Sequence, residues 1–313
     1  MIDADMANNV DTDFFSPEAH VEAKEHLYFI LCAIISIFFY VAFILACGLG
    51  IIIVLINLSI IVLIVKIMQT IAFAQLKQNA IKITEEQFSL VYKKSKEFSK
   101  KLKLKKLPEI YILQSSGALN AFATRFLFND YVILYSDIME LAYKEGEDAV
   151  AFVVAHELAH LQRNHLMKYS LTFPIVVFPF LRNALSRACE TTCDNIAAAL
   201  VPNNSLEGLL VLLAGKELYK KVNVKEFLVT ANKNYNHSAW AAEIRMSHPY
   251  LSRRLHNIAK KTNQEYVASL PKDMFKVSKF LCFITGIAEI IIWLLILMSI
   301  LAGIGASSMT GLK

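Results

Sequence analysis

The sequence lacks charge over one long stretch, because no Asp, Glu, Lys or Arg occurs in Leu27–Val65. An α-helix rises about 1.5 Å per residue, and about 20 apolar residues cross a bilayer. The stretch is therefore long enough for two spans. Glycines at its middle, in Gly48-Leu49-Gly50, favour a tight reversal, so we expect a transmembrane hairpin of roughly Leu27–Cys47 and Ile51–Ile67, within residues 27–70.

A basic region is also lacking in front of this stretch. The flank is acidic instead, with Asp3, Asp5, Asp11, Asp13, Glu18, Glu22 and Glu25. Secretory signal peptides open with a basic region and have a short apolar core, so the pattern favours spans over a cleaved signal. Residues 1–26 show no apolar periodicity, and we expect this acidic segment to be poorly ordered.

Cysteine is scarce, with five in 313 residues, and the sequence has no internal repeat and no low-complexity tract. Cys32, Cys47 and Cys282 lie in apolar runs, whereas Cys189 and Cys193 lie in the more polar middle of the chain. This usage implies no disulfide framework and fits a reducing compartment around the middle region.

The chain is rich in apolar residues and still carries charge: 56% of residues are hydrophobic, 19% are charged, and the mean hydropathy is +0.45. This mixture indicates a soluble domain tied to membrane spans. A third candidate span covers residues 280–304. Glu289 is the one ionisable residue inside it, and such a group is costly unless it is paired or near water.

Lysines decide the expected orientation. Eight of them lie between Lys93 and Lys106, and three more, Lys272, Lys276 and Lys279, precede the third span. Because lysine and arginine favour the cytoplasmic side, we expect a multi-pass protein of the plasma or inner membrane with its middle domain in the cytoplasm. The net charge of +5 is then explained by lysines that face anionic lipid headgroups, and not by a nucleic-acid partner.

The middle region is predicted to be mainly helical with two short strands. Thr84-Glu85-Glu86-Gln87 has the form of a capping box, so we expect a basic amphipathic connector helix within residues 71–107, which Pro108 ends. The apolar residues 169–181 are too few to span a bilayer and are expected to be buried or interfacial. Strands are expected at 109–113 and 131–135, and helices at 146–166, 182–200, 205–221 and 247–261. Between the last two helices we expect a looser stretch up to residue 246.

One of these helices carries a metal-binding pattern, His156-Glu157-Leu158-Ala159-His160. Residues four apart on a helix share one face, so His156 and His160 can bind one metal ion. Glu157 beside them can take a proton from a metal-bound water. Imidazole and carboxylate ligands suit zinc, so we expect one Zn²⁺ per chain. The pattern alone also fits an amphipathic helix with two incidental histidines.

A third ligand is needed, and Glu190 on the next helix is the favoured candidate. Asp194, four residues later, shares its face and can hydrogen-bond a ligating imidazole. His165 is a rival ligand, although it lies off the face of the histidine pair, and Cys189 and Cys193 are further alternatives.

Four motifs occur in an order that resembles one family. They are Gly117–Thr124 with Asn120-Ala121-Phe122-Ala123 at its core, His156–His160, Ser186–Asp194, and Ser247-His248-Pro249 with Arg254. Over roughly residues 80–265 the chain resembles the integral-membrane zinc metalloproteases that include HtpX and, more distantly, the CAAX prenyl protease. The resemblance implies a mainly helical chain with a small β-sheet, that is, an α+β zincin-type metalloprotease domain at 108–270 and about three transmembrane helices.

The resemblance also implies roles for individual residues. Glu190 is then the third zinc ligand, and Asp194 supports the site behind it. We expect Arg254 to pair with a carboxylate of the site, such as Asp194. The resemblance further implies that His248 stabilises the oxyanion formed at the scissile carbonyl, and that the substrate backbone is held by Asn120, Ala121 and Phe122.

Two features depart from the family pattern. Thr191 and Cys193 stand where the family usually has a bulky residue and an alanine. Only 29 residues separate the histidine motif from Glu190, which leaves no room for a further pair of spans. We therefore expect three spans instead of four.

The leading hypothesis is a membrane-anchored zinc metalloendopeptidase that hydrolyses polypeptides in or near the bilayer, with the zinc-bound water activated by Glu157. One alternative is a non-catalytic membrane scaffold that keeps the protease fold. The other is a dedicated processing protease for a single lipidated or signal-like peptide. The intact Glu157 argues against the scaffold, which has no need of a general base.

Overall fold

The computed structural model describes residues 15–114, 121–126, 129–145, 148–203 and 205–262. The third span expected at 280–304, the lysines before it, Asn120 and Glu289 all lie outside the described residues. The described part is mostly helical and contains one four-stranded sheet and two long apolar helices. The expected α+β class with a few membrane helices is therefore confirmed.

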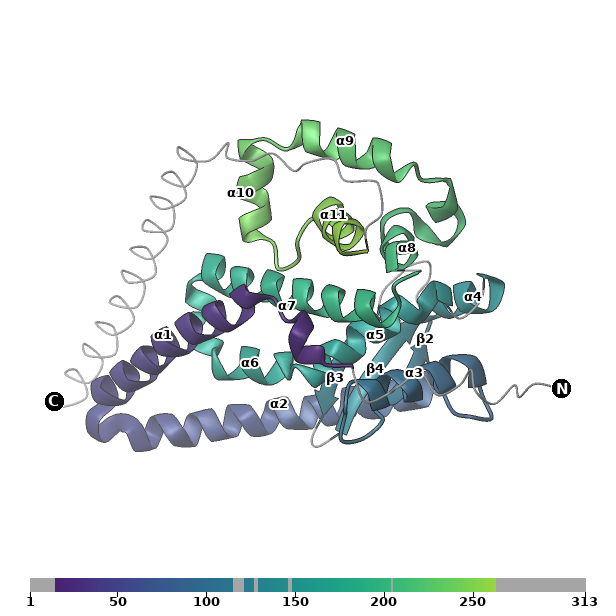
Figure 1. The fold of residues 1–313 in the computed structure, drawn as a ribbon. Coiled ribbons are helices and arrows are strands. Elements are labelled where there is room, and N and C mark those ends of the chain that lie inside the picture. The colour runs from purple at the N-terminus through teal and green to yellow at the C-terminus, as the bar shows by residue number, and fades with distance from the viewer. Residues whose placement is uncertain (1–14, 115–120, 127–128, 146–147, 204, 263–313) are drawn as a thin grey trace.

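Two apolar helices, α1 (Ala23–Cys47) and α2 (Ile51–Asn79), project from the rest of the fold and meet at the turn Gly48–Gly50 (Figure 1). Gly48 has φ 46°, which L side chains rarely adopt, so the reversal falls where glycine permits it. Most side chains of both helices are exposed, although an 18-residue window of α1 has a mean hydropathy of 2.7 and one of α2 has 2.5. Exposed apolar surface of this extent is typical of a membrane or protein contact, and each helix is long enough to cross a bilayer.

The sheet contains β1 (Ile81–Lys82), β2 (Glu109–Leu113), β3 (Ala121–Phe126) and β4 (Asn129–Tyr135) in the order β1-β2-β4-β3. The two predicted strands correspond to β2 and β4, which pair in parallel, whereas β1 and β3 pair antiparallel on either side. Successive residues of a strand face opposite sides of a sheet. Val132 and Leu134 therefore join the main core, and Tyr131 and Ile133 face the end of α2.

The predicted connector helix is divided in two. α2 continues to Asn79, and the lysine-rich helix α3 covers only Ser89–Lys101. Between them Thr84–Gln87 forms a tight turn, in which the Gln87 N–H donates to the carbonyl and hydroxyl oxygens of Thr84. Phe88 then has φ 66°, which breaks the helical path and delays the helix to Ser89.

The metal-binding pattern lies on α5 (Asp148–Gln162), which is packed between the sheet and α7 (Pro179–Leu200) (Figure 1). α4 (Ser136–Glu145) precedes it. The apolar connection to α7 consists of α6 (His165–Leu171) and the 3-10 turn Phe173–Val177. In this turn Ile175 is buried and Phe173 is exposed, as expected for a segment that is partly buried and partly interfacial.

Among the described residues α7 is followed by α8 (Ser205–Leu218), α9 (Val224–Asn234), α10 (His237–Arg245) and α11 (Leu251–Lys261) (Figure 1). α10 and α11 pack on α7, whereas α8 packs on α5 and α11, and α9 packs on α11. The expectation of a looser stretch up to residue 246 is therefore wrong. Asn223 and Asn236 cap α9 and α10, because their side chains accept hydrogen bonds from the N–H groups of Glu226 and Ala239.

Residues 15–26 are packed against the domain, contrary to the expectation of a poorly ordered acidic segment. The N–H of Glu22 donates to Thr192 Oγ1, and the Asn195 side chain donates to the carbonyl of His20. Glu25 is fully buried and pairs with Lys168 of α6. Tertiary contacts with α6 and α7 therefore order a segment whose own sequence has no periodicity.

Candidate metal centre

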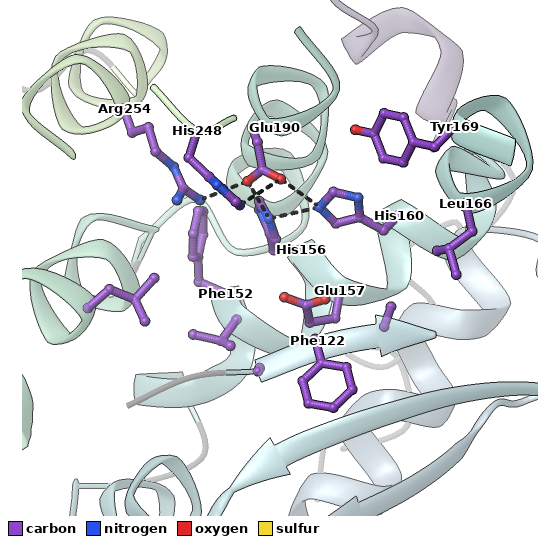
Figure 2. Close-up of a pocket in the computed structure, with 14 residues that line it drawn as sticks. Phe122, Phe152, His156, Glu157, His160, Leu166, Tyr169, Glu190, His248 and Arg254 are labelled. Atoms are coloured by element: carbon purple, nitrogen blue, oxygen red, sulfur yellow. Dashed lines mark hydrogen bonds and ion pairs between the residues drawn. The ribbon is translucent and has the colours of Figure 1, made fainter. Parts of the chain in front are cut away.

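Helix α5 presents one face of the histidine motif to α7. His156 and His160 stand one helical turn apart, and Glu190 reaches them from α7 (Figure 2). All three side chains are buried or nearly so, with 8%, 14% and 6% of their surface exposed. Their polar atoms therefore depend on one another, or on an ion, to replace lost hydration.

The ligand atoms of these three side chains lie near the spacing that tetrahedral zinc needs, with each oxygen of Glu190 facing one histidine. His160 Nε2 lies 3.2 Å from His156 Nε2 and 3.3 Å from Glu190 Oε1. His156 Nε2 lies 3.4 Å from Glu190 Oε2. Ligands about 2.0–2.1 Å from a tetrahedral zinc lie about 3.3 Å from one another. The donor set of two imidazoles and one carboxylate thus fits a zinc ion and leaves a fourth position.

Behind His156, a carboxylate faces the second ring nitrogen at a short distance, although the two atoms form no hydrogen bond. Asp194 Oδ1 lies 3.0 Å from His156 Nδ1. Arg254 of α11 binds both oxygens of Asp194 through Nε and Nη2, each at 2.7 Å. The expected pair of Arg254 with a carboxylate of the site is present, and this paired arrangement fixes the ring of His156.

Behind His160, the supporting group is another imidazole. His165 at the start of α6 is fully buried, and its Nδ1 lies 3.0 Å from Nδ1 of His160. Its Nε2 lies 3.4 Å from Oε1 of Glu25, at the start of α1. Cys193 Sγ is 3.6 Å from His165 Nδ1. The rival ligands of the sequence analysis thus gather behind His160, on the side away from His156.

These contacts shift the titration of several groups. Burial alone lowers the pKa of His156, but Asp194 and Glu190 outweigh it and raise that pKa to about 10. Burial favours the protonated form of Glu190, yet the two histidines hold its pKa well below the usual range. Burial lowers the pKa of His165 to about 4, against the opposing effect of Glu25, so this imidazole is neutral at physiological pH.

The site opens into a cavity of about 380 Å³. Glu157 extends from α5 toward the edge strand β3, and its carboxylate stands beside the histidine pair (Figure 2). Ala121, Phe122 and Ala123 of β3 line the same cavity. Within the described residues β3 is the last strand of the sheet, so its outer edge faces no further strand.

His248 approaches the metal ligands from the segment between α10 and α11 (Figure 2). Its Nε2 lies 3.4 Å from Glu190 Oε1, and 59% of its side chain is exposed. Ser247 Oγ is 2.9 Å from the other ring nitrogen. His248 thus lies at the mouth of the cavity, whereas Asn120 falls outside the described residues.

The structure also brings in residues that sequence reasoning missed. Phe152, Val153, Leu166, Tyr169 and Leu212 line the cavity and make its wall apolar. Phe152 stands one turn before His156 on α5, which helical spacing alone could have indicated.

Two family models match the chain. Peptidase family M48 matches residues 85–178, and Peptidase U49 matches residues 142–270. Comparisons with curated proteins and with solved structures found no match. The M48 match contains the histidine pair and the edge strand, and the U49 match contains every other residue of the site described above except Glu25.

Proposed function

Because the models of Peptidase family M48 and of Peptidase U49 match parts of the chain, we propose that it is a zinc metalloendopeptidase that cleaves membrane or membrane-proximal proteins. The observation that carries the proposal is the zinc-like spacing of His156, His160 and Glu190 in one cavity with Glu157. Zinc, when bound, supplies a Lewis acid that polarises a peptide carbonyl and makes water more acidic.

Different residues of the chain then have different roles in hydrolysis. Glu157 takes a proton from the attacking water and returns it to the leaving amine, because its carboxylate is the acid–base group beside the histidines. His248 at the cavity mouth donates a hydrogen bond to the oxyanion. The substrate backbone adds to the edge of β3, with Asn120, Ala121 and Phe122 as the nearest contacts.

The setting favours a substrate at the membrane. α1 and α2 are apolar enough to cross a bilayer, and the lysines of α3 favour the cytoplasmic side for the domain. A multi-pass arrangement with a cytoplasmic catalytic domain follows from this, and it gives the cavity access to polypeptides that leave the bilayer on that side.

The experiment that tests the proposal combines zinc analysis with digestion of unfolded casein by the purified full chain. We expect about one zinc per chain in wild type and in Glu157→Gln, because Glu157 is not a ligand. We expect Glu157→Gln to lower kcat by a factor of about 10² to 10⁴, the usual contribution of a general base.

The matched control is Glu217→Gln, which changes an exposed glutamate that pairs with Lys144 on the surface. It should leave both zinc content and digestion unchanged. Stoichiometric zinc without any digestion by wild type would favour the scaffold, and equal digestion by wild type and Glu157→Gln would remove Glu157 from the mechanism.

A further inference from the structure

Glu25 and His165 stand in a line behind the metal ligand His160, and no role in hydrolysis accounts for them. We propose that both are positioning residues, and that Glu25 holds His165 so that His165 holds the His160 ring toward the metal. This inference rests on the proposed zinc site. It makes the first apolar helix, which carries Glu25, part of the metal centre.

The proton arrangement follows from the chemistry of imidazole. When Nε2 of His160 gives its lone pair to a metal, the proton of that ring is on Nδ1. At 3.0 Å this N–H donates to Nδ1 of His165, which therefore has no proton of its own. The proton of His165 is then on Nε2, which lies 3.4 Å from the carboxylate of Glu25 without forming a hydrogen bond, so Glu25 acts on this N–H through its charge.

Glu25 has unusual surroundings for a residue of an apolar helix. It is the third residue of α1, its exposed fraction is 0%, and its Oε1 also pairs with Lys168 and Arg163. An ionised group in such a helix is costly unless it is paired, so these contacts keep it charged. The pairs also anchor the start of α1 to α6 and to the residue after α5.

A second metal site formed with Glu25 is one alternative arrangement that these residues suggest. Glu25, His165 and Cys189 have ligand atoms within 4.8 Å of one another. However, Glu25 Oε1 already faces two cations, the ammonium of Lys168 and the guanidinium of Arg163. Positive groups at that oxygen disfavour a metal ion there, so an orienting chain accounts better for the contacts.

The two histidine ligands thus have different supports. His156 is held by Asp194 and Arg254, which belong to the domain helices α7 and α11. His160 is held through His165 by Glu25 of α1. Correct seating of α1 on the domain therefore sets the orientation of one ligand, and with it the affinity for zinc.

The test uses the full chain in detergent, with zinc affinity measured by competition with a chromophoric chelator. Glu25→Gln and His165→Leu should each weaken zinc binding by about 10- to 100-fold, as loss of a ligand's hydrogen-bond partner does elsewhere. The absorption spectrum of the cobalt-loaded protein should also change, because it reports ligand geometry. Glu22→Gln is the matched control, since its side chain makes no contact with His165, and it should behave as wild type.

A comparison of two substitutions separates positioning from packing. His165→Gln keeps one acceptor for His160 and one N–H donor for Glu25, whereas His165→Leu keeps volume without polar atoms. Positioning predicts that Gln restores most of the zinc affinity lost with Leu. A packing role predicts that Leu is at least as good as Gln.

Folding is checked by thermal unfolding of each variant. If Glu25→Gln alone fails to fold, Glu25→Gln/Lys168→Met removes the buried pair together and takes its place. Unchanged zinc affinity in folded Glu25 and His165 variants overturns the inference, and so do two zinc ions per chain. If wild type binds no zinc, the proposed function fails as well; if wild type binds zinc and digests casein, only the positioning role is at stake.

Discussion

Among single residues, Asp194 has the most constrained position, because it lies between a metal ligand and an arginine in the protein interior. Burial raises the pKa of Asp194, but Arg254 outweighs this effect and holds the pKa below its usual range. The carboxylate therefore stays charged, and its stability in the interior depends on the two bonds from the guanidinium.

Removing Arg254 tests this dependence. Arg254→Met leaves the Asp194 charge buried with one cationic partner fewer, so we expect a loss of about 3–5 kcal/mol in the free energy of unfolding. Denaturant unfolding in detergent, followed by circular dichroism, measures it. Arg245→Met, at an exposed arginine of α10, should change stability by less than about 0.5 kcal/mol. Equal denaturant concentrations at the unfolding midpoints of the two variants would contradict the prediction.

The sequence indicated much of the site at this scale, for physical reasons that differ between residues. His156, Glu157 and His160 lie within one helical turn, so the helical period alone brings them together. Glu25 could not be found in this way. It meets Lys168 across 143 residues, and only the packing of α1 on α6 creates the contact.

Between elements, α5 and α8 pack tightly at Gly208, beside the site. A Cβ atom added to Gly208 of α8 would lie 2.7 Å from Cβ and Cδ1 of Phe152. Real Cβ atoms do not approach other atoms so closely. The Cβ atom of Phe152 is bonded directly to the backbone of α5, the helix that also carries His156. Any substitution at Gly208 therefore pushes the metal-binding helix away from α8.

Gly208→Ala should destabilise the protein by about 1–3 kcal/mol, as overpacking of a core does. It should also weaken zinc binding, because Phe152 lies one turn before His156. Thermal unfolding and chelator competition measure the two effects. Gly50→Ala is the matched control, since nothing lies within 4 Å of the added Cβ and its φ is −71°. A Gly208→Ala protein as stable as the control would refute this account of the packing.

Helices and strands whose apolar residues recur with a clear period were predicted from the sequence. Helices that are recognisable mainly by their capping residues were not. β2 and β4 have buried runs of β-branched and aromatic residues, and both strands appeared at the expected positions. α9 and α10 were missed, although Asn223 and Asn236 are good N-cap residues. The edge strand β3 has small and polar residues among its aromatics, and only its pairing with β4 defines it.

For the whole molecule, the orientation in the membrane is the main open property. The lysine-rich α3 and the loop after it offer exposed trypsin sites, such as Lys103, Lys105 and Lys106. With the domain on the cytoplasmic side, trypsin should cut these sites in inside-out membrane vesicles and leave them intact in sealed right-side-out vesicles. Immunoblots against a C-terminal tag follow the cleavage, and detergent lysis of both preparations is the control. Cleavage in the right-side-out vesicles alone would reverse the proposed topology.

If α2 crosses a bilayer as proposed, its unbroken length also fixes how far the proposed peptide-binding edge of β3 stands from the lipid. With 29 residues at about 1.5 Å each, α2 is about 43 Å long, and the hydrocarbon core takes about 30 Å of it. Its last turns pack on the sheet, where Phe73 stacks on Phe126 of β3 with ring centroids 4.3 Å apart. Because Phe73 stands 22 residues after Ile51, about 33 Å along the helix, the sheet would begin about 3 Å beyond the hydrocarbon core, about one residue of extended chain. In this arrangement a membrane-anchored substrate would reach the edge of the sheet with very little unfolded polypeptide outside the lipid.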